Sequence, residues 1–171
     1  MQAAAALDPG AALAAPGVIV LQFARGSGID SQAIEWYGGG PLYSHVDSVM
    51  PDGTLLGART DGGVAIRPAT YLGDEPVLRV ELPAGDTMTA AYYAGVTAEL
   101  GKPYDVQGIL AFVLGRDWRD PNSWFCSELV AAKLEGCGYW PFPLASPSNK
   151  VTPPNLILVL STKVQINVPE V

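Results

Sequence analysis

Two side chains in this sequence are suited to nucleophilic chemistry: the single histidine, His45, and the cysteine Cys126. A thiol attacks a carbonyl carbon as the thiolate, and both the N-terminus of a helix and a neighbouring imidazolium favour that form. An imidazole beside such a thiol can take its proton and later donate it to a leaving group. These residue types therefore predict thiol-based acyl chemistry in a fold that brings them together.

The surroundings of Cys126 indicate the start of a helix. Asn122 and Ser123 are good N-cap residues, and apolar residues then recur at helical spacing over residues 124–136. Cys126 is therefore expected in the first turn, a position that also suits a small buried hydrophobe. Cys137 lies just beyond the predicted helix, has no second histidine to activate it, and is expected to be inert.

The surroundings of His45 indicate a β-hairpin. Residues 43–50 and, less regularly, 54–60 alternate between apolar and polar types, and the Asp-Gly pair at 52–53 favours a two-residue turn. That turn would place Thr60 directly opposite His45 on the neighbouring strand.

A histidine that acts as a base needs its second ring nitrogen held by a hydrogen-bond acceptor. The predicted register gives this role to the hydroxyl of Thr60. Asp47 is the competing candidate, because residues two apart in a strand share a face and Asp47 therefore lies on the same side as His45. The residues alone leave both candidates open.

The 171 residues are enough for one domain with a core and too few for two ordinary ones. Residues 1–16 are expected to form a flexible lead-in, and residues 17–171 the domain. We expect an α+β fold with an antiparallel sheet of five or six strands packed against helices. The remaining predicted strands are 18–23, 64–68, 77–82, 157–160 and 164–168, the predicted helices are 29–37 and 86–100, and 106–114 fits a short helix or a hydrophobic loop.

Composition excludes several classes of protein. Hydrophobic residues make up 49% and charged residues 16%, the reverse of a disordered chain. A net charge of −7 argues against a nucleic-acid partner. No apolar run approaches the roughly 20 residues of a membrane span, and the N-terminus makes a poor secretory signal, so we expect a soluble protein of unassigned compartment. One histidine and two distant cysteines imply no metal and no cofactor.

Three short segments together resemble a known family. They are Tyr-Ser-His-Val at 43–46, Gly-Lys-Pro-Tyr-Asp at 101–105 and Phe-Cys-Ser-Glu-Leu-Val at 125–130. Their order is similar to that of the permuted papain-like amidases of the NlpC/P60 superfamily, the bacterial YiiX/YaeF-like group, in which the histidine precedes the cysteine. The resemblance runs from about residue 17 to the Thr-Pro-Pro segment at 152–154 and implies a circularly permuted papain-like fold.

The resemblance also implies residue roles. It makes Cys126 the nucleophile and His45 the general base of a cysteine peptidase or amidase. The third polar residue of the family, often a glutamate, lies on the strand after the histidine. Residues 57–60 contain no carboxylate, so Thr60 is the carried-over candidate.

The backbone N–H of Cys126 is expected to form part of an oxyanion hole, because helix N-terminal amides point toward a forming anion. The hydroxyl of Tyr43 or Tyr104 could supply a second donor. Trp124 belongs to an aromatic-rich segment that either lines an apolar substrate groove or packs in the core; its other members are Trp118, Tyr139, Trp140 and Phe142.

The substrate class stays open. The resemblance implies a peptide or isopeptide amide, such as a bacterial cell-wall stem peptide, but the permuted branch is also similar to acyltransferases and hydrolases that act on lipid acyl groups. A degenerate binding module of the same fold is the non-enzymatic alternative.

Overall fold

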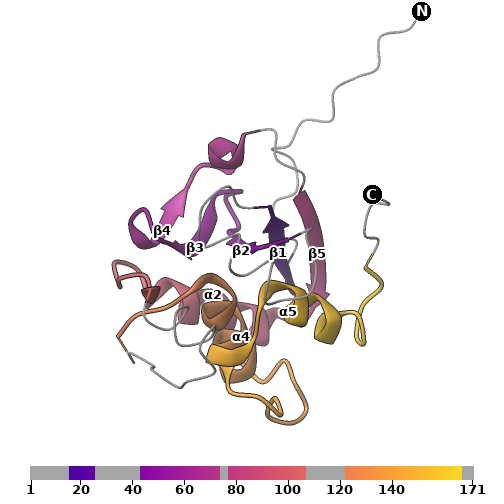
Figure 1. Cartoon of the computed structure of the whole chain (residues 1–171). Helices are drawn as coiled ribbons and strands as arrows, with labels where there is room; N and C mark the ends of the chain where they lie inside the picture. The colour runs from indigo at the N-terminus through magenta and orange to yellow at the C-terminus, as the bar shows by residue number, and fades with distance from the viewer. Residues whose placement is uncertain (1–15, 26–42, 74–76, 107–121, 167–171) are drawn as a thin grey trace, which may run out of the picture.

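The computed structural model describes residues 16–25, 43–73, 77–106 and 122–166, and it has an α+β fold. An open antiparallel sheet of five strands in the order β4-β3-β2-β1-β5 is covered on one face by three helices (Figure 1). The strands are β1 (Val18–Ala24), β2 (His45–Val49), β3 (Leu55–Arg59), β4 (Gly63–Arg67) and β5 (Val77–Pro83). The helices are α2 (Asp86–Thr97), α4 (Cys126–Gly136) and α5 (Pro153–Leu160), with short 3-10 helices η1 (Ala69–Leu72) and η2 (Ser148–Lys150).

The main hydrophobic core lies between the sheet and the helices. Alternate residues of β1 point toward the helices, because successive side chains of a strand face opposite sides. These residues, Ile19, Leu21 and Phe23, are fully buried and pack with Tyr92 of α2 and Leu129 of α4. The five strands predicted up to residue 82 and the helices predicted at 86–100 and 124–136 are confirmed, with small differences at their ends.

The hairpin between β2 and β3 differs from its prediction by one residue. The backbone N–H of Met50 donates to the carbonyl of Thr54 (2.8 Å), and Ser48 pairs with Leu56. The turn therefore has three residues, and Gly53 at its end adopts the left-handed conformation (φ +83°) typical of such turns. The predicted two-residue turn is wrong, and its register is wrong by one position.

The two late strands predicted near the C-terminus are also wrong. Residues 157–160 belong to α5, which starts with a capping box between Thr152 and Asn155 and has Pro153 at its first position. A short apolar run fits a buried strand and a buried helix equally well, and here the cap decides. Residues 164–166, the described part of the last predicted strand, are not in a strand. The predictions at 1–15, 29–37 and 107–114 lie outside the described residues.

The loop after α2 fixes the start of α4 against the sheet. Val64 of β4 accepts a hydrogen bond from the N–H of Gly101 (2.9 Å) and donates one to the carbonyl of Lys102 (2.9 Å). One residue later, the carbonyl of Pro103 accepts a hydrogen bond from the N–H of Trp124 (3.1 Å). The residues that lead into α4 are therefore tied to β4 through backbone hydrogen bonds.

The described helices are short. The longest, α2, has 12 residues, and none of the described helices is long and apolar enough to cross a membrane.

We predict that Gly63→Ala destabilises the fold more than Gly53→Ala. Both glycines have positive φ angles, so alanine costs roughly 1–2 kcal/mol of backbone strain at either position. Only at Gly63 would the added Cβ also meet a backbone atom, the carbonyl oxygen of Lys102 at 2.2 Å, whereas Gly53 has open space around it. Urea unfolding measures both free energies, and equal losses would contradict the close packing of this loop on β4.

Candidate active site

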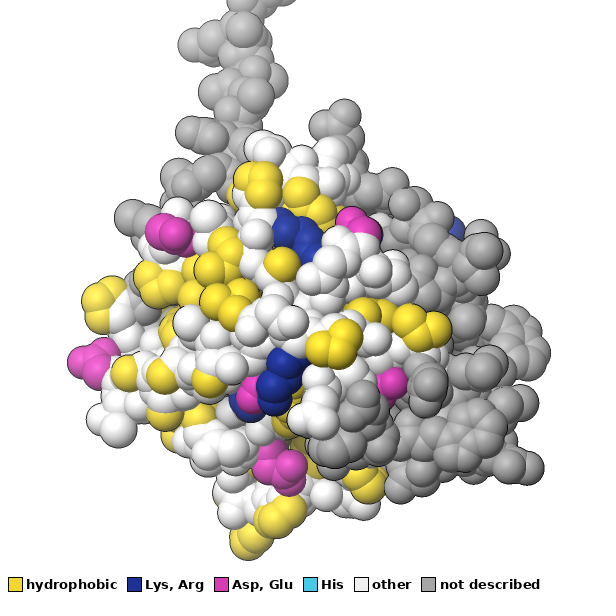
Figure 2. Space-filling model, turned by 90° about the vertical axis from the view of Figure 1, so that its left-hand side faces the viewer, with side chains coloured by type: hydrophobic (Ala, Val, Ile, Leu, Met, Phe, Trp, Pro, Cys, Tyr) yellow, Lys and Arg dark blue, Asp and Glu magenta, His cyan; other side chains and the backbone are white. Residues whose placement is uncertain are grey.

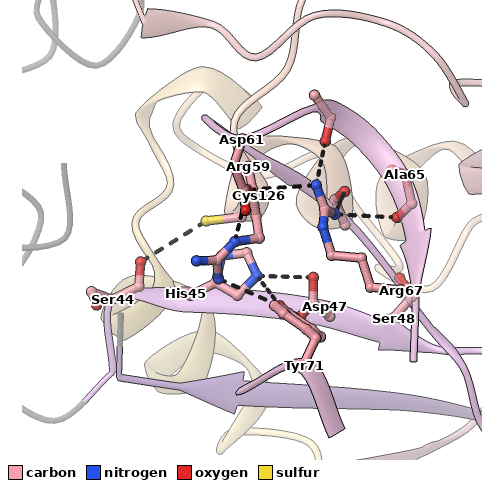
Figure 3. Close-up of polar contacts among 12 residues, drawn as sticks. Ser44, His45, Asp47, Ser48, Arg59, Asp61, Ala65, Arg67, Tyr71 and Cys126 are labelled. Atoms are coloured by element: carbon pink, nitrogen blue, oxygen red, sulfur yellow. Dashed lines mark hydrogen bonds and ion pairs between the residues drawn. The ribbon is translucent and has the colours of Figure 1, made fainter. Parts of the chain in front are cut away.

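Cys126 is the first residue of α4, as the sequence predicts. Phe125 before it is extended (φ −103°, ψ 166°) and makes no side-chain cap, so the first amides of the helix have no acceptor within the helix or from the N-cap side chain. These amides give the helix start a partial positive charge that favours an anion. The Cys126 sulfur lies 4.0 Å from the carbonyl oxygen of Ser44, the residue before β2 (Figure 3).

His45 opens β2 at the end of the strand that faces Cys126. Its Nε2 atom lies 2.9 Å from Oδ1 of Asp47, two residues along the same strand. In Figure 3 the imidazole of His45 lies between the carboxylate of Asp47 and the sulfur of Cys126. The structure therefore brings together the thiol, the only imidazole of the chain and a carboxylate.

Asp47, rather than Thr60, holds the imidazole. The observed pairing of Ser48 with Leu56, continued along both strands, brings Arg59 opposite His45. Thr60 is exposed in the turn that follows β3. The expectation that Thr60 faces His45 is wrong because the hairpin turn contains one residue more than predicted.

Gly57 makes room for the Asp47 side chain. A Cβ atom added at Gly57 would lie 1.8 Å from Oδ1 of Asp47 and 3.4 Å from the carbonyl oxygen of Val46. Glycine in the interior of a strand often marks such a close approach. Gly57 is therefore the feature of the sequence that could have indicated a side chain of the neighbouring strand packed against this position.

Tyr71 of η1 also belongs to the site, although it is not among the site residues predicted from the sequence. Its hydroxyl donates a hydrogen bond to Oδ2 of Asp47 and lies 3.1 Å from Nε2 of His45. Nη1 of Arg59 lies 3.5 Å from the same hydroxyl. Nothing local in the sequence around Tyr71 indicates these contacts, because η1 follows a different strand.

The site is arranged to keep His45 positively charged. Burial alone lowers the pKa of His45, but the charge and hydrogen bond of Asp47, helped by a hydrogen bond and charge attraction from Cys126, raise it to about 10. Burial likewise raises the pKa of Asp47, but the His45 charge and the hydrogen bonds from His45 and Tyr71 bring it below its usual value. At neutral pH the pair is therefore an imidazolium and a carboxylate.

The reacting groups are shielded from bulk water. Cys126 is 1% exposed, His45 is 6% exposed and Asp47 is 1% exposed. Electrostatic interactions are stronger in such an environment than in water, which strengthens the coupling among the three side chains.

The remaining predicted site residues have structural contacts. Tyr43 is buried in the main core, where burial raises its pKa, and Tyr104 is partly buried, with its backbone bridged to Trp124. The indole of Trp124 donates to Glu99 (2.7 Å), and Lys133 lies over its ring. These contacts make Trp124 a support for the start of α4.

No protein-family model matches the sequence, and a search of curated proteins gives no match either. Within the described ranges, no group of three or more His, Cys, Asp and Glu side chains is placed to hold a metal ion.

We predict that the protein loses stability as the pH rises from 7 toward 10. The pKa of His45 is about 10 in the folded protein and about 6.5 in the unfolded chain, so folding favours its protonated form. That stabilisation is fully present below pH 6.5 and disappears as the pH passes 10. The free energy of unfolding in urea, measured across this range, should fall more steeply for the wild type than for His45→Gln. Parallel curves for the two proteins would show that folding does not raise the pKa of His45.

Proposed function

We propose that this protein is a cysteine-dependent hydrolase that cleaves an amide bond. Cys126 is the nucleophile, His45 the general base and acid, and Asp47 the residue that orients the imidazole. The observation that carries the proposal is the position of His45, which interacts with a carboxylate through one ring nitrogen and with the Cys126 thiol at a helix N-terminus.

The proposed reaction starts from an ion pair of the Cys126 thiolate and the His45 imidazolium, which carries a proton on each ring nitrogen. Because Nε2 of His45 is engaged by Asp47, Nδ1 is the nitrogen whose proton is available for transfer. The thiolate attacks the carbonyl carbon, and the first amides of α4 stabilise the tetrahedral oxyanion. His45 then donates its proton to the leaving amine, which leaves a thioester on Cys126.

Water completes the cycle. His45 takes a proton from the water that attacks the thioester. The tetrahedral intermediate that results collapses to a carboxylic acid and expels the Cys126 thiolate. The same thioester could be resolved by another nucleophile, in which case the product is a transferred acyl group. Hydrolysis and transfer therefore share every residue of the site.

Several observations support a permuted papain-like fold as part of this proposal. The histidine lies on a strand that precedes the cysteine helix in the chain, the cysteine begins that helix, and the sheet is antiparallel. The short motifs around His45 and Cys126 add to these observations. Asp47 departs from the family pattern, because it lies on the histidine's own strand instead of the following one.

Charge bears on the choice of substrate. On the face shown in Figure 2, Lys and Arg side chains form small separate groups with acidic side chains beside them. Arg59 pairs with Asp61, and Glu99 is paired with both Lys102 and Lys133. With a net charge of −7, these pairs favour a peptide or an acyl group of low charge over a strongly anionic polymer.

A non-catalytic binding module is the second candidate, and the burial of Cys126 favours it. A substrate reaches a sulfur that is 1% exposed only after neighbouring groups move. Reactivity of the thiol distinguishes the two functions directly.

We predict that iodoacetamide modifies Cys126 rapidly at pH 7 and Cys137 slowly. Cys137 is half-buried, its thiol donates to the carbonyl of Leu134 (3.3 Å), and burial raises its pKa. An unperturbed thiol is only a few per cent ionised at pH 7, so His45→Gln should slow the modification of Cys126 about tenfold or more. Mass spectrometry of the peptides follows each thiol separately.

The controls for this experiment are Cys126→Ala, which should lose the fast phase, and Cys137→Ser, which should keep it. Equal alkylation rates for the two thiols, or an unreactive Cys126, would contradict the proposed enzymatic function. Turnover of peptide amides and of lipid esters, each compared with Cys126→Ala, then separates the two substrate classes.

A further inference from the structure

The ring of Tyr71 is fixed on the face of the sheet opposite the helices. Together with Leu72 it packs against a small apolar cluster formed by Val20, Val49 and Leu55. These three residues come from β1, β2 and β3, so η1 is anchored across the middle of the sheet. Asp47 shares this face with Val49, because the two are separated by two positions in β2.

Two guanidinium groups hold the same ring. The Cζ atoms of Arg59 and Arg67 lie 5.1 Å and 5.8 Å from its centre, within the range of a cation–π contact. Arg67 is itself fixed to the sheet, since it donates to the carbonyls of Gly57, Gly63 and Ala65 at 3.1–3.3 Å. The position of the Tyr71 hydroxyl is therefore set by packing and by charge, not by the hydroxyl's own hydrogen bonds alone.

The hydroxyl acts on both members of the His45–Asp47 pair. It donates its one proton to Oδ2 of Asp47, and its oxygen lies 3.1 Å from Nε2 of His45. Asp47 thus uses one carboxylate oxygen for the imidazole and the other for Tyr71. Burial and the charge of Asp47 raise the pKa of Tyr71, which keeps the hydroxyl protonated and able to donate.

We infer that Tyr71 is a positioning residue of the site: it fixes the ionised carboxylate of Asp47 against His45 and keeps the pair out of contact with water. The inference rests on the proposed function, since this arrangement matters for the chemistry of Cys126. A carboxylate without this donor is easier to protonate and free to turn away from the ring. Tyr71 then supports the reaction through Asp47 without itself touching the substrate.

The test is Tyr71→Phe, which removes the hydroxyl and retains the ring that packs against the sheet. Because the chain has a single histidine, the NMR signals of its imidazole belong to His45 without ambiguity. In acid these signals report the protonation of Asp47. We expect that step to occur about one pH unit higher in Tyr71→Phe, the effect of losing a hydrogen bond to a charged group. The pH below which the alkylation of Cys126 slows should also be higher in Tyr71→Phe than in the wild type.

Tyr92→Phe is the matched control. The Tyr92 hydroxyl is also buried and also bonds to a residue of β2, Ser48 (2.7 Å), but on the helix face of the strand. Both variants should lose stability, and only Tyr71→Phe should move the titration. In an Asp47→Asn background, Tyr71→Phe should have no further effect on the alkylation profile, because Tyr71 acts through Asp47.

Equal titration curves for Tyr71→Phe and the wild type would overturn the inference, and so would equal shifts in Tyr71→Phe and Tyr92→Phe. Failure of the proposed function gives a different result. In that case Cys126 of the wild type is no more reactive than Cys137, while the imidazole titration still measures whether Tyr71 holds Asp47.

Discussion

The site depends on one buried ion pair, that of His45 with Asp47. A charged imidazole and a carboxylate each lose hydration when they are buried, and this cost is offset only when the two meet closely and their remaining hydrogen bonds are made. Three features satisfy that condition here. Gly57 leaves the space that the carboxylate occupies, Tyr71 donates to its second oxygen, and the Cys126 thiol faces the other side of the ring.

The fold brings the partners of this pair together from distant parts of the chain. β2 carries His45 and Asp47 in the middle of the sheet, and η1 covers one face of that strand. The helix that begins with Cys126 packs on the other face, and the loop after α2 ties its entry to β4. The thiol is consequently placed at the end of β2 by backbone hydrogen bonds, independently of the charges it meets there.

The sequence predicts the elements better than the contacts between them. β-Branched runs and helical spacing identify the strands and the helix of Cys126, because both patterns follow from burial of one face. The predicted pairing of Thr60 with His45 is wrong, because a turn longer by one residue shifts every later pair of the hairpin by one position. The strand predicted at 157–160 is wrong, although Thr152 and Asn155, which form a capping box, are a sequence signal for the start of a helix. Tyr71 lies 24 positions from Asp47, and only the three-dimensional path of η1 joins them.

The charge on His45 at mildly alkaline pH is the most direct test of this account. The ¹⁵N chemical shifts of the single imidazole distinguish a ring with two protonated nitrogens from a neutral one. Since the pKa of His45 is about 10, both nitrogens should carry protons at pH 8, with the Nε2 proton directed to Asp47. A ring that is neutral at pH 8 and titrates near 6.5, as in an unstructured peptide, would contradict the central claim.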